Sequence, residues 1–170
     1  TGDDAHGALY SFRVPGSVFL RRIDGSRARL AGGDLKRLDP GSRSADALVD
    51  GDDSTYAQTR IGTSAGRSNW DLALPSRRTV AAVRVALGTS SFAVRAYRIE
   101  AWDGASWMPL HGAVATGLAP GVVHEATYRV EPMVSTDSLR LVILASHPYG
   151  TYYRKYSHVL RTFEAQEEGP

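Results

Sequence analysis

The chain has 170 residues, a formal net charge of +2 and no cysteine. This length is typical of one domain with a single hydrophobic core. The lack of cysteine excludes disulfides, thiolate zinc sites and thiol nucleophiles, so any metal must be held by oxygen atoms or by histidine. No apolar run approaches the ~20 residues that a transmembrane helix needs.

Apolar and polar residues alternate along most of the chain, and turn signals recur at short intervals, which predicts β-strands. In chain order, we expect strands at residues 18–23, 70–74, 80–87, 95–102, 107–110, 122–130, 138–145 and 159–165. A helical turn is expected only at residues 44–49. This pattern of about eight short strands predicts an all-β fold of two packed sheets, as in β-sandwiches and jelly rolls.

The pattern also suggests how the chain is divided. Residues 1–34 are predicted to form an N-terminal extension, either an extra hairpin turning at Asp24-Gly25 or an extended lead-in. The sandwich itself is expected over residues 35–166, and residues 167–170 as a linker remnant. Two connections, at residues 58–69 and 146–157, are too long for simple turns. Long loops in compact domains often carry function, so we expect a binding site there.

Residues 47–56 (ALVDGDDSTY) have the composition of a calcium-binding loop. Three carboxylates and two hydroxyls lie within residues 50–55, and a glycine bends the segment. Calcium takes about 6–8 oxygen ligands, including backbone carbonyls. The spacing does not match an EF-hand, so further ligands must come from elsewhere, and Glu164 on the last predicted strand is the candidate. The alternative is an ordinary surface turn, because Asp-Gly also occurs at residues 24–25 and 103–104.

Residues 35–166 resemble the discoidin family, also called the coagulation factor V/VIII type C family, of the galactose-binding-like superfamily. Residues 50–56 match its motif Asp-Gly-Asp-x-x-Thr followed by an aromatic residue. Four further weak motifs follow in the family's order. They lie at residues 69–74 (NWDLAL), 79–85 (TVAAVRV), 97–107 (YRIEAWDGASW), and, for the last two strands together, 139–143 (LRLVI) with 159–165 (VLRTFEA).

This resemblance implies an eight-stranded antiparallel jelly roll, often with one structural calcium ion (Ca2+). Carried over residue by residue, the calcium ligands would be Asp50, Asp53, Thr55 and Glu164, with backbone carbonyl oxygens near Ala47. Two positions depart from the family pattern, because Tyr56 stands where tryptophan is commoner and Trp102 where serine is usual. The terminal disulfide of vertebrate members is missing. The resemblance therefore points to the bacterial branch, whose members are mostly carbohydrate-binding modules of secreted glycosidases or lyases.

In such modules the ligand lies on loops at one edge of the sandwich. Sugars are bound by aromatic faces together with planar hydrogen-bonding groups. Residues 147–156 (HPYGTYYRKY) hold four tyrosines and two cations between two predicted strands. The alternative is that these tyrosines pack the loop onto the sandwich. The predicted ligand-binding residues are Arg60, Arg67, Asn69, Phe92, Arg95, His147, Tyr149, Tyr152, Tyr153 and Arg154.

We do not expect the chain to be an enzyme. Residues 62–66 (GTSAG) fit the Gly-x-Ser-x-Gly pattern of hydrolases, but that motif requires a strand before it and a helix after it. The predicted function is a non-catalytic, carbohydrate-binding module within a larger secreted or cell-surface protein, and we expect it to be monomeric. The alternative is an adhesion module that binds membrane surfaces or proteins through the same loops. Nucleic acid is not an expected partner, because the arginines do not form one basic stripe.

Overall fold

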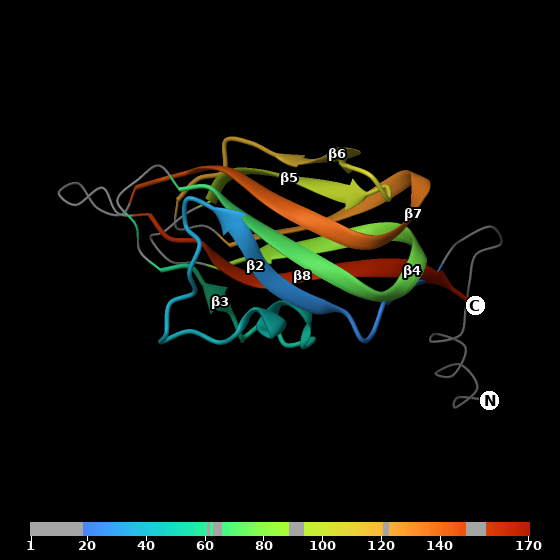
Figure 1. Cartoon of the computed structure of the whole chain (residues 1–170), viewed down its shortest axis with the longest axis horizontal. Coiled ribbons are helices and arrows are strands. Elements are labelled where there is room, and N and C mark those ends of the chain that lie inside the picture. Colours follow the sequence, from blue (N-terminus) through green and yellow to red (C-terminus); the bar gives the residue numbers. More distant parts are fainter. Residues whose placement is uncertain (1–18, 61, 63–65, 89–93, 121–122, 149–155) are drawn as a thin grey trace, which may run out of the picture.

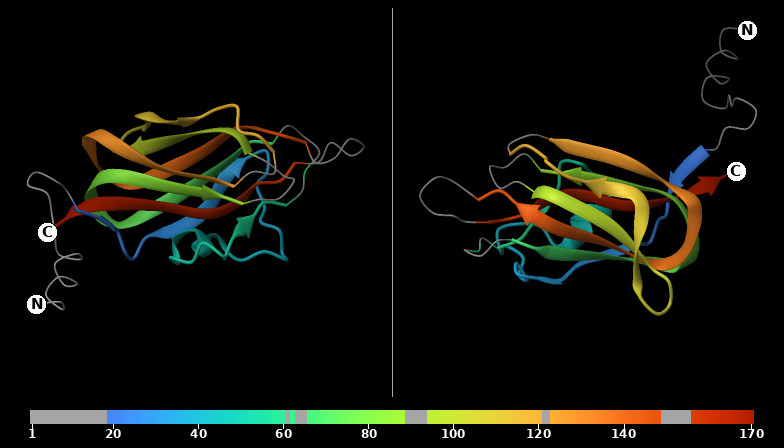
Figure 2. Two further views of the ribbon diagram at one scale, coloured as in Figure 1. Left: turned by 180° about the vertical axis from the view of Figure 1, so that it is seen from behind. Right: turned by 90° about the horizontal axis from the view of Figure 1, so that it is seen from above.

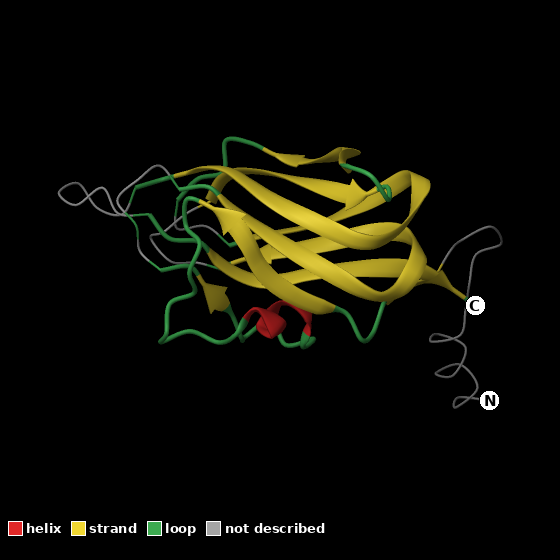
Figure 3. Cartoon of the chain, viewed as in Figure 1, coloured by secondary structure: helices red, strands yellow, loops and turns green. Residues whose placement is uncertain are grey.

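The computed structural model describes residues 19–60, 62, 66–88, 94–120, 123–148 and 156–170. These residues are almost entirely strands and connecting loops (Figure 3). The elements in chain order are β1 (Phe19–Arg22), β2 (Arg27–Gly33), the 3-10 helix η1 (Ala45–Val49), β3 (Ala57–Gln58), β4 (Ser68–Leu87), β5 (Val94–Trp102), β6 (Trp107–Ala115), β7 (His124–Ser146) and β8 (Val159–Gly169).

Two long strands, β4 and β7, take part in both layers of the molecule (Figure 1). Residues 68–73 of β4 pair with residues 138–143 of β7. Residues 82–87 of β4 pair instead with residues 124–129 of β7 and with β8. Because both strands bend between these parts, the strands form one continuous antiparallel sheet folded into two layers. The first layer carries β2, β5 and β6 at its sides, and the second carries β8, β1 and β3.

The core lies between the two layers. Along the strands, alternate side chains point inward, as the period of a strand requires. Trp70 and Leu72 of β4, Leu141 of β7 and Phe163 of β8 are completely buried. Burying a side chain of this size contributes about 1.5–3 kcal/mol. Leu48 of η1 is also buried, so the 3-10 helix packs against the core beside β2 and β8.

The predicted all-β sandwich is confirmed, and so is the helical turn, which η1 provides. Four predicted strands are joined in pairs, however. The strands predicted at residues 70–74 and 80–87 are both part of β4, and those predicted at residues 122–130 and 138–145 are both part of β7, which begins at His124. Each join contains a proline, which cannot donate a hydrogen bond within a ladder. In the structure, Pro75 and Pro132 lie where these strands bend from one layer to the other.

Residues 19–33 contribute two strands, β1 and β2, to the sheet. β1 pairs with β8 and β2 pairs with β4, so these two strands do not pair with each other and the expectation of an extra hairpin is wrong. β8 continues to Gly169 and pairs there with Phe19. The domain boundaries drawn after residues 34 and 166 stay predictions. Among the described residues, no helix is long and apolar enough to cross a membrane.

The antiparallel arrangement brings the starts of β4, β5, β7 and β8 and the end of β7 to one side of the molecule, on the left in Figure 1. We call this side the loop end. The described chain termini and the bends of β4 and β7 lie at the opposite end, and the two further views agree (Figure 2). The described members of the predicted ligand-binding set, Arg60, Arg67, Asn69, Arg95 and His147, lie at or beside strand ends at the loop end.

Candidate functional site

A basic hollow lies at the loop end, beside the start of β4. Its volume is about 280 Å³, and its cationic lining residues are Lys36, Arg37 and Arg60. Asp34 is the acidic residue in the lining. All four side chains are exposed. Within the described part of the chain, none of the three cations forms an ion pair, so their charge is available to a ligand.

Backbone contacts place these cations together. The amide of Arg60 donates a hydrogen bond to the carbonyl of Arg37 at 2.6 Å, and the carbonyl of Arg67 accepts from the amides of Asp34 and Leu35. The Leu35 side chain is buried and packs directly against Gly62, where an added Cβ would approach it to 2.5 Å. A side chain at position 62 would force the end of the Leu35 side chain to move, so glycine suits this close approach of the segment bearing the cations to the residues before β4.

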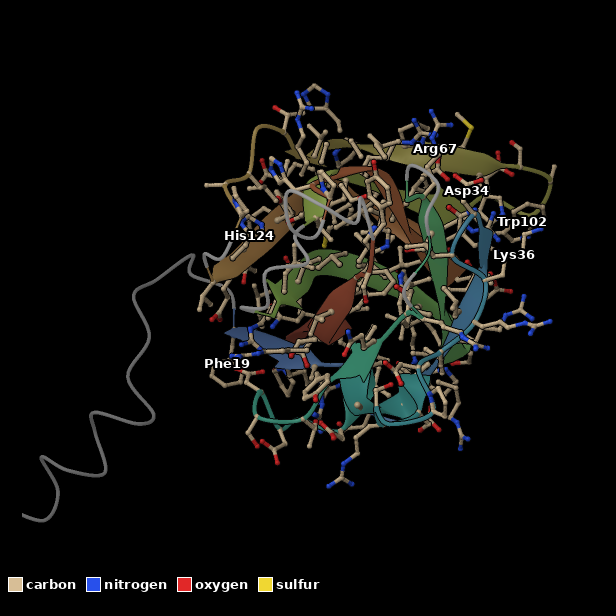
Figure 4. The ribbon with its side chains drawn as sticks, turned by 90° about the vertical axis from the view of Figure 1, so that its left-hand side faces the viewer. Phe19, Asp34, Lys36, Arg67, Trp102 and His124 are labelled. Carbon is tan, nitrogen blue, oxygen red and sulfur yellow. The ribbon has the colours of Figure 1, made fainter. Side chains whose placement is uncertain are left out.

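Arg67 and Asn69 mark the beginning of β4. Arg67 is exposed, and Figure 4 shows it on the same side of the loop end as Asp34 and Lys36. Asn69 pairs with Val142 in the sheet and alternates with buried neighbours, so its side chain faces outward from the first layer. Of the predicted ligand residues, Arg60 lines the hollow. Arg67 lies beside the hollow, because its carbonyl accepts hydrogen bonds from Asp34 and Leu35. Lys36 and Arg37 were missing from the prediction.

Arg95 and His147 belong to another part of the loop end. His147 Nε2 lies 2.7 Å from the carbonyl oxygen of Leu118, and the Leu118 amide donates to the carbonyl of Arg95 at 3.0 Å. A smaller hollow of about 60 Å³ lies nearby, with Leu118 and His124 in its lining. The His147 ring therefore positions the connection between β6 and β7. The predicted residues Phe92, Tyr149, Tyr152, Tyr153 and Arg154 lie outside the described residues.

Tyr97 links this smaller hollow to the core. Its ring is completely buried, and its hydroxyl lies 2.7 Å from His124 Nε2 and 2.7 Å from the Tyr128 hydroxyl. Burial raises the pKa of Tyr97, with the hydrogen bond to Tyr128 adding to the effect. Burial also lowers the pKa of His124. Both groups are therefore favoured in their neutral forms, as hydrogen-bonding groups that hold β5 and β7 together at this end.

A second buried network lies beneath the basic hollow. The Trp70 indole donates to the Ser68 hydroxyl at 2.9 Å, and that hydroxyl lies 2.6 Å from His158 Nδ1. His158 is completely buried, and burial lowers its pKa to about 3. Ser68 is equally buried. Because no substrate reaches a hydroxyl at this depth, this serine and histidine act as structural hydrogen-bonding groups rather than as a nucleophile and base.

The loop predicted to bind calcium is well ordered by its own hydrogen bonds. Asp50 accepts from the Thr55 hydroxyl at 2.6 Å and from the Asp52 amide at 2.8 Å. Asp53 points elsewhere, toward Arg84 and Thr162. Among the described residues, no three acidic or histidine side chains converge as a metal site requires. The side chains predicted to bind calcium are therefore not arranged around one point in this structure, and calcium binding stays a prediction.

Comparisons with known proteins identify the fold. No protein-family model matches the sequence, and no curated protein matches it. Solved structures do match. The family 32 carbohydrate-binding module of NanJ from C. perfringens, in complex with galactose, is 15% identical with a TM-score of 0.62, and the match covers 88% of this chain and all (100%) of that one. The figures are the same for chitosan-binding module 1 from a Paenibacillus sp. IK-5 chitosanase/glucanase.

An F5/8 type C domain from Bacteroides fragilis matches with a TM-score of 0.57 at 17% identity, covering 92% of this chain and 100% of that domain. The chain thus has the β-sandwich fold of family 32 carbohydrate-binding modules and F5/8 type C domains. The resemblance predicted from its motifs is confirmed at the level of the fold. At identities this low, the likeness shows the fold alone, and any ligand must be argued from this chain's own residues.

Proposed function

We propose that this chain is a non-catalytic carbohydrate-binding module whose ligand lies at the loop end and carries acidic groups. The observation that carries this proposal is the basic hollow formed by Lys36, Arg37 and Arg60. Arginine presents a planar fork that matches carboxylate and sulfate groups, and lysine adds a mobile point charge. A hollow of about 280 Å³ is close to the lower end of the usual range for small-ligand sites, about 300 Å³.

The geometry favours a sugar polymer over a small anion. The hollow is open and shallow, with all its charged side chains exposed, so a ligand would extend beyond it along the loop end. Arg67 lies beside it, and the predicted aromatic residues follow β7 in the chain. A chain of uronic acid or sulfated sugars repeats its charge at regular intervals, which allows several cations to be engaged at once.

The shared fold supports this proposal. One structure with this fold is in complex with galactose, and another is a chitosan-binding module derived from a chitosanase/glucanase. By analogy, we place the chain in a larger extracellular protein that acts on or adheres to polysaccharides. Because one fold can carry many functions, the basic hollow of this chain is the feature that specifies an acidic ligand.

The test is a binding panel that separates charge from sugar type. Polygalacturonate, alginate and a sulfated glycan are compared with neutral galactan and dextran by affinity electrophoresis and calorimetry, and liposomes are tested by sedimentation. We expect retardation by the acidic polysaccharides and weak or no retardation by the neutral ones. Binding to liposomes without binding to any glycan would refute the proposal and favour an adhesion module for membranes.

A further inference from the structure

Arg84 lies at the centre of a charged cluster on the outside of the second layer. Its neighbours on β4, Val83 and Val85, point into the core, so Arg84 points outward. Its guanidinium contacts Asp53 through two nitrogen–oxygen pairs, at 2.5 and 3.2 Å. It also donates to Glu125 at 2.8 and 3.1 Å. The side chain is only 19% exposed, although it is fully charged.

These partners belong to three separate parts of the chain. Asp53 lies in the loop after η1, Glu125 at the start of β7, and Glu164 on β8, where its carboxylate lies 3.6 Å from the Arg84 guanidinium. Thr162 of β8 donates a further hydrogen bond to Asp53 at 2.7 Å. One guanidinium therefore connects the loop to β4, β7 and β8. Charge-assisted and paired contacts of this kind are the strongest hydrogen bonds that side chains form.

The same carboxylates were predicted to bind calcium. Asp53 and Glu164 would be calcium ligands by resemblance, but here Arg84 contacts both. A second guanidinium, that of Arg22, lies close to Gly51 and pairs with Asp24. Calcium would have to displace the Arg84 guanidinium from Asp53 and Glu164 before it could bind these carboxylates.

We propose that Arg84 is the resident cation of this loop and ties it to the sandwich in place of a divalent metal ion. Three contacts carry the proposal: both oxygens of Asp53 and one of Glu164 face the guanidinium. The loop then needs no calcium to stay folded. This inference does not depend on the proposed sugar binding, and it departs from the calcium site that the family resemblance implies.

The first test uses the unmodified chain. Thermal unfolding is followed by circular dichroism after exhaustive treatment with EDTA and again with about 5 mM calcium chloride. A ligand that binds only the folded state raises Tm by mass action, so a resident calcium ion would be revealed by a clear difference between the two curves. We expect the two curves to coincide. A Tm that falls with EDTA and recovers with calcium would overturn the proposal.

The second test removes the guanidinium. Arg84→Gln leaves Asp53, Glu125 and Glu164 without the guanidinium that they share, and we expect Tm to fall by about 3–8 °C. Arg78→Gln is the matched control, since Arg78 is on the same strand and pairs with Glu167 away from the loop. Equal Tm values for the two variants would also overturn the proposal.

A milder substitution protects the test against a variant that fails to fold. Asp53→Asn keeps the size of the side chain and leaves Arg84 with Glu125 and Glu164. Its control is Asp52→Asn, because the hydrogen bonds of the Asp52 carboxylate to described residues stay within the loop, from Ser54. We expect a lower Tm for the Asp53 variant than for the Asp52 variant. A lower Tm for the Asp52 variant than for the Asp53 variant would refute the proposal that Arg84 ties the loop to the sandwich.

Discussion

The two basic regions of this chain differ in how their charges are partnered. Arg84 is largely covered and has carboxylates from three segments around it, whereas Lys36, Arg37 and Arg60 are exposed and have no ion pair among the described residues. Both regions are rich in cations. Removing a partnered, covered cation leaves its carboxylates unpaired and costs stability, while exposed, unpartnered cations are available to a ligand and contribute little to stability.

A similar contrast exists within the first layer. Arg140 donates to Asp71 at 2.6 and 2.9 Å and lies 4.1 Å above the centre of the Trp107 ring. Arg29 approaches the same Asp71 at 3.4 Å but is 75% exposed. One carboxylate thus has a well-held partner and a loosely held one. Whether a charged side chain is held in close ion pairs therefore indicates its structural role better than the number of charges around it does.

The largest expected effect concerns a loop-end group whose role is structural. The folded chain holds His158 neutral down to a pH of about 3, because burial lowers its pKa. In the unfolded chain, histidine takes up its proton near pH 6.5. Below that pH, the unfolded state binds more protons than the folded state, so the free energy of unfolding falls as pH falls, by up to about 1.4 kcal/mol per pH unit.

The measurement is urea unfolding followed by tryptophan fluorescence at several pH values between 7 and 4. His158→Gln removes the group that titrates while keeping polar atoms near Ser68. We expect this variant to be less stable at pH 7 but to have a flatter dependence on pH than the parent chain. Parallel pH profiles for the two proteins would show that His158 is not the source of the pH dependence of stability.

The next effect compares Arg140 with Arg29. Arg140→Met leaves Asp71, which is 7% exposed, without its main partner, and we expect a loss of about 2 kcal/mol in the free energy of unfolding. Arg29→Met removes an exposed contact to the same carboxylate and should cost less than about 0.5 kcal/mol. Urea unfolding of both variants provides the measurement. Similar losses would mean that partnership does not distinguish structural from available charges.

The fold was largely predictable because it depends on local alternation. On β4, Trp70, Leu72 and Val85 follow polar residues in the sequence and are completely buried, and on β7 the completely buried Leu139, Leu141 and Ile143 lie in the apolar run before residue 145. The corners were harder to predict. Pro75 and Pro132 end ladder pairing locally, and nothing local indicates that each strand continues into the other layer beyond them.

The site was less predictable because its contacts join distant residues. Arg84 looks like an ordinary outward residue of a strand, and its partners Asp53 and Glu164 are far from it in the sequence. An oxygen-rich loop predicts a cation without identifying it as a metal or a guanidinium. Lys36 and Arg37 had one local signal, since they are consecutive cations between the buried Leu35 and the partly buried Leu38.

The smallest expected effect on stability is also the one that tests the available charges. Arg37→Glu and Arg60→Glu reverse two charges of the basic hollow, and each should weaken binding of an acidic polysaccharide about tenfold, a change of about 1.4 kcal/mol. The Tm of each variant should stay within about 1 °C of the parent, because exposed charges contribute little to stability.

Arg129→Glu is the control, as an exposed arginine on β7 outside the hollow. Affinity is measured by calorimetry at two salt concentrations, and higher salt should weaken the parent more than the variants. Equal affinities for the parent and all three variants would show that the basic hollow is not part of the binding site.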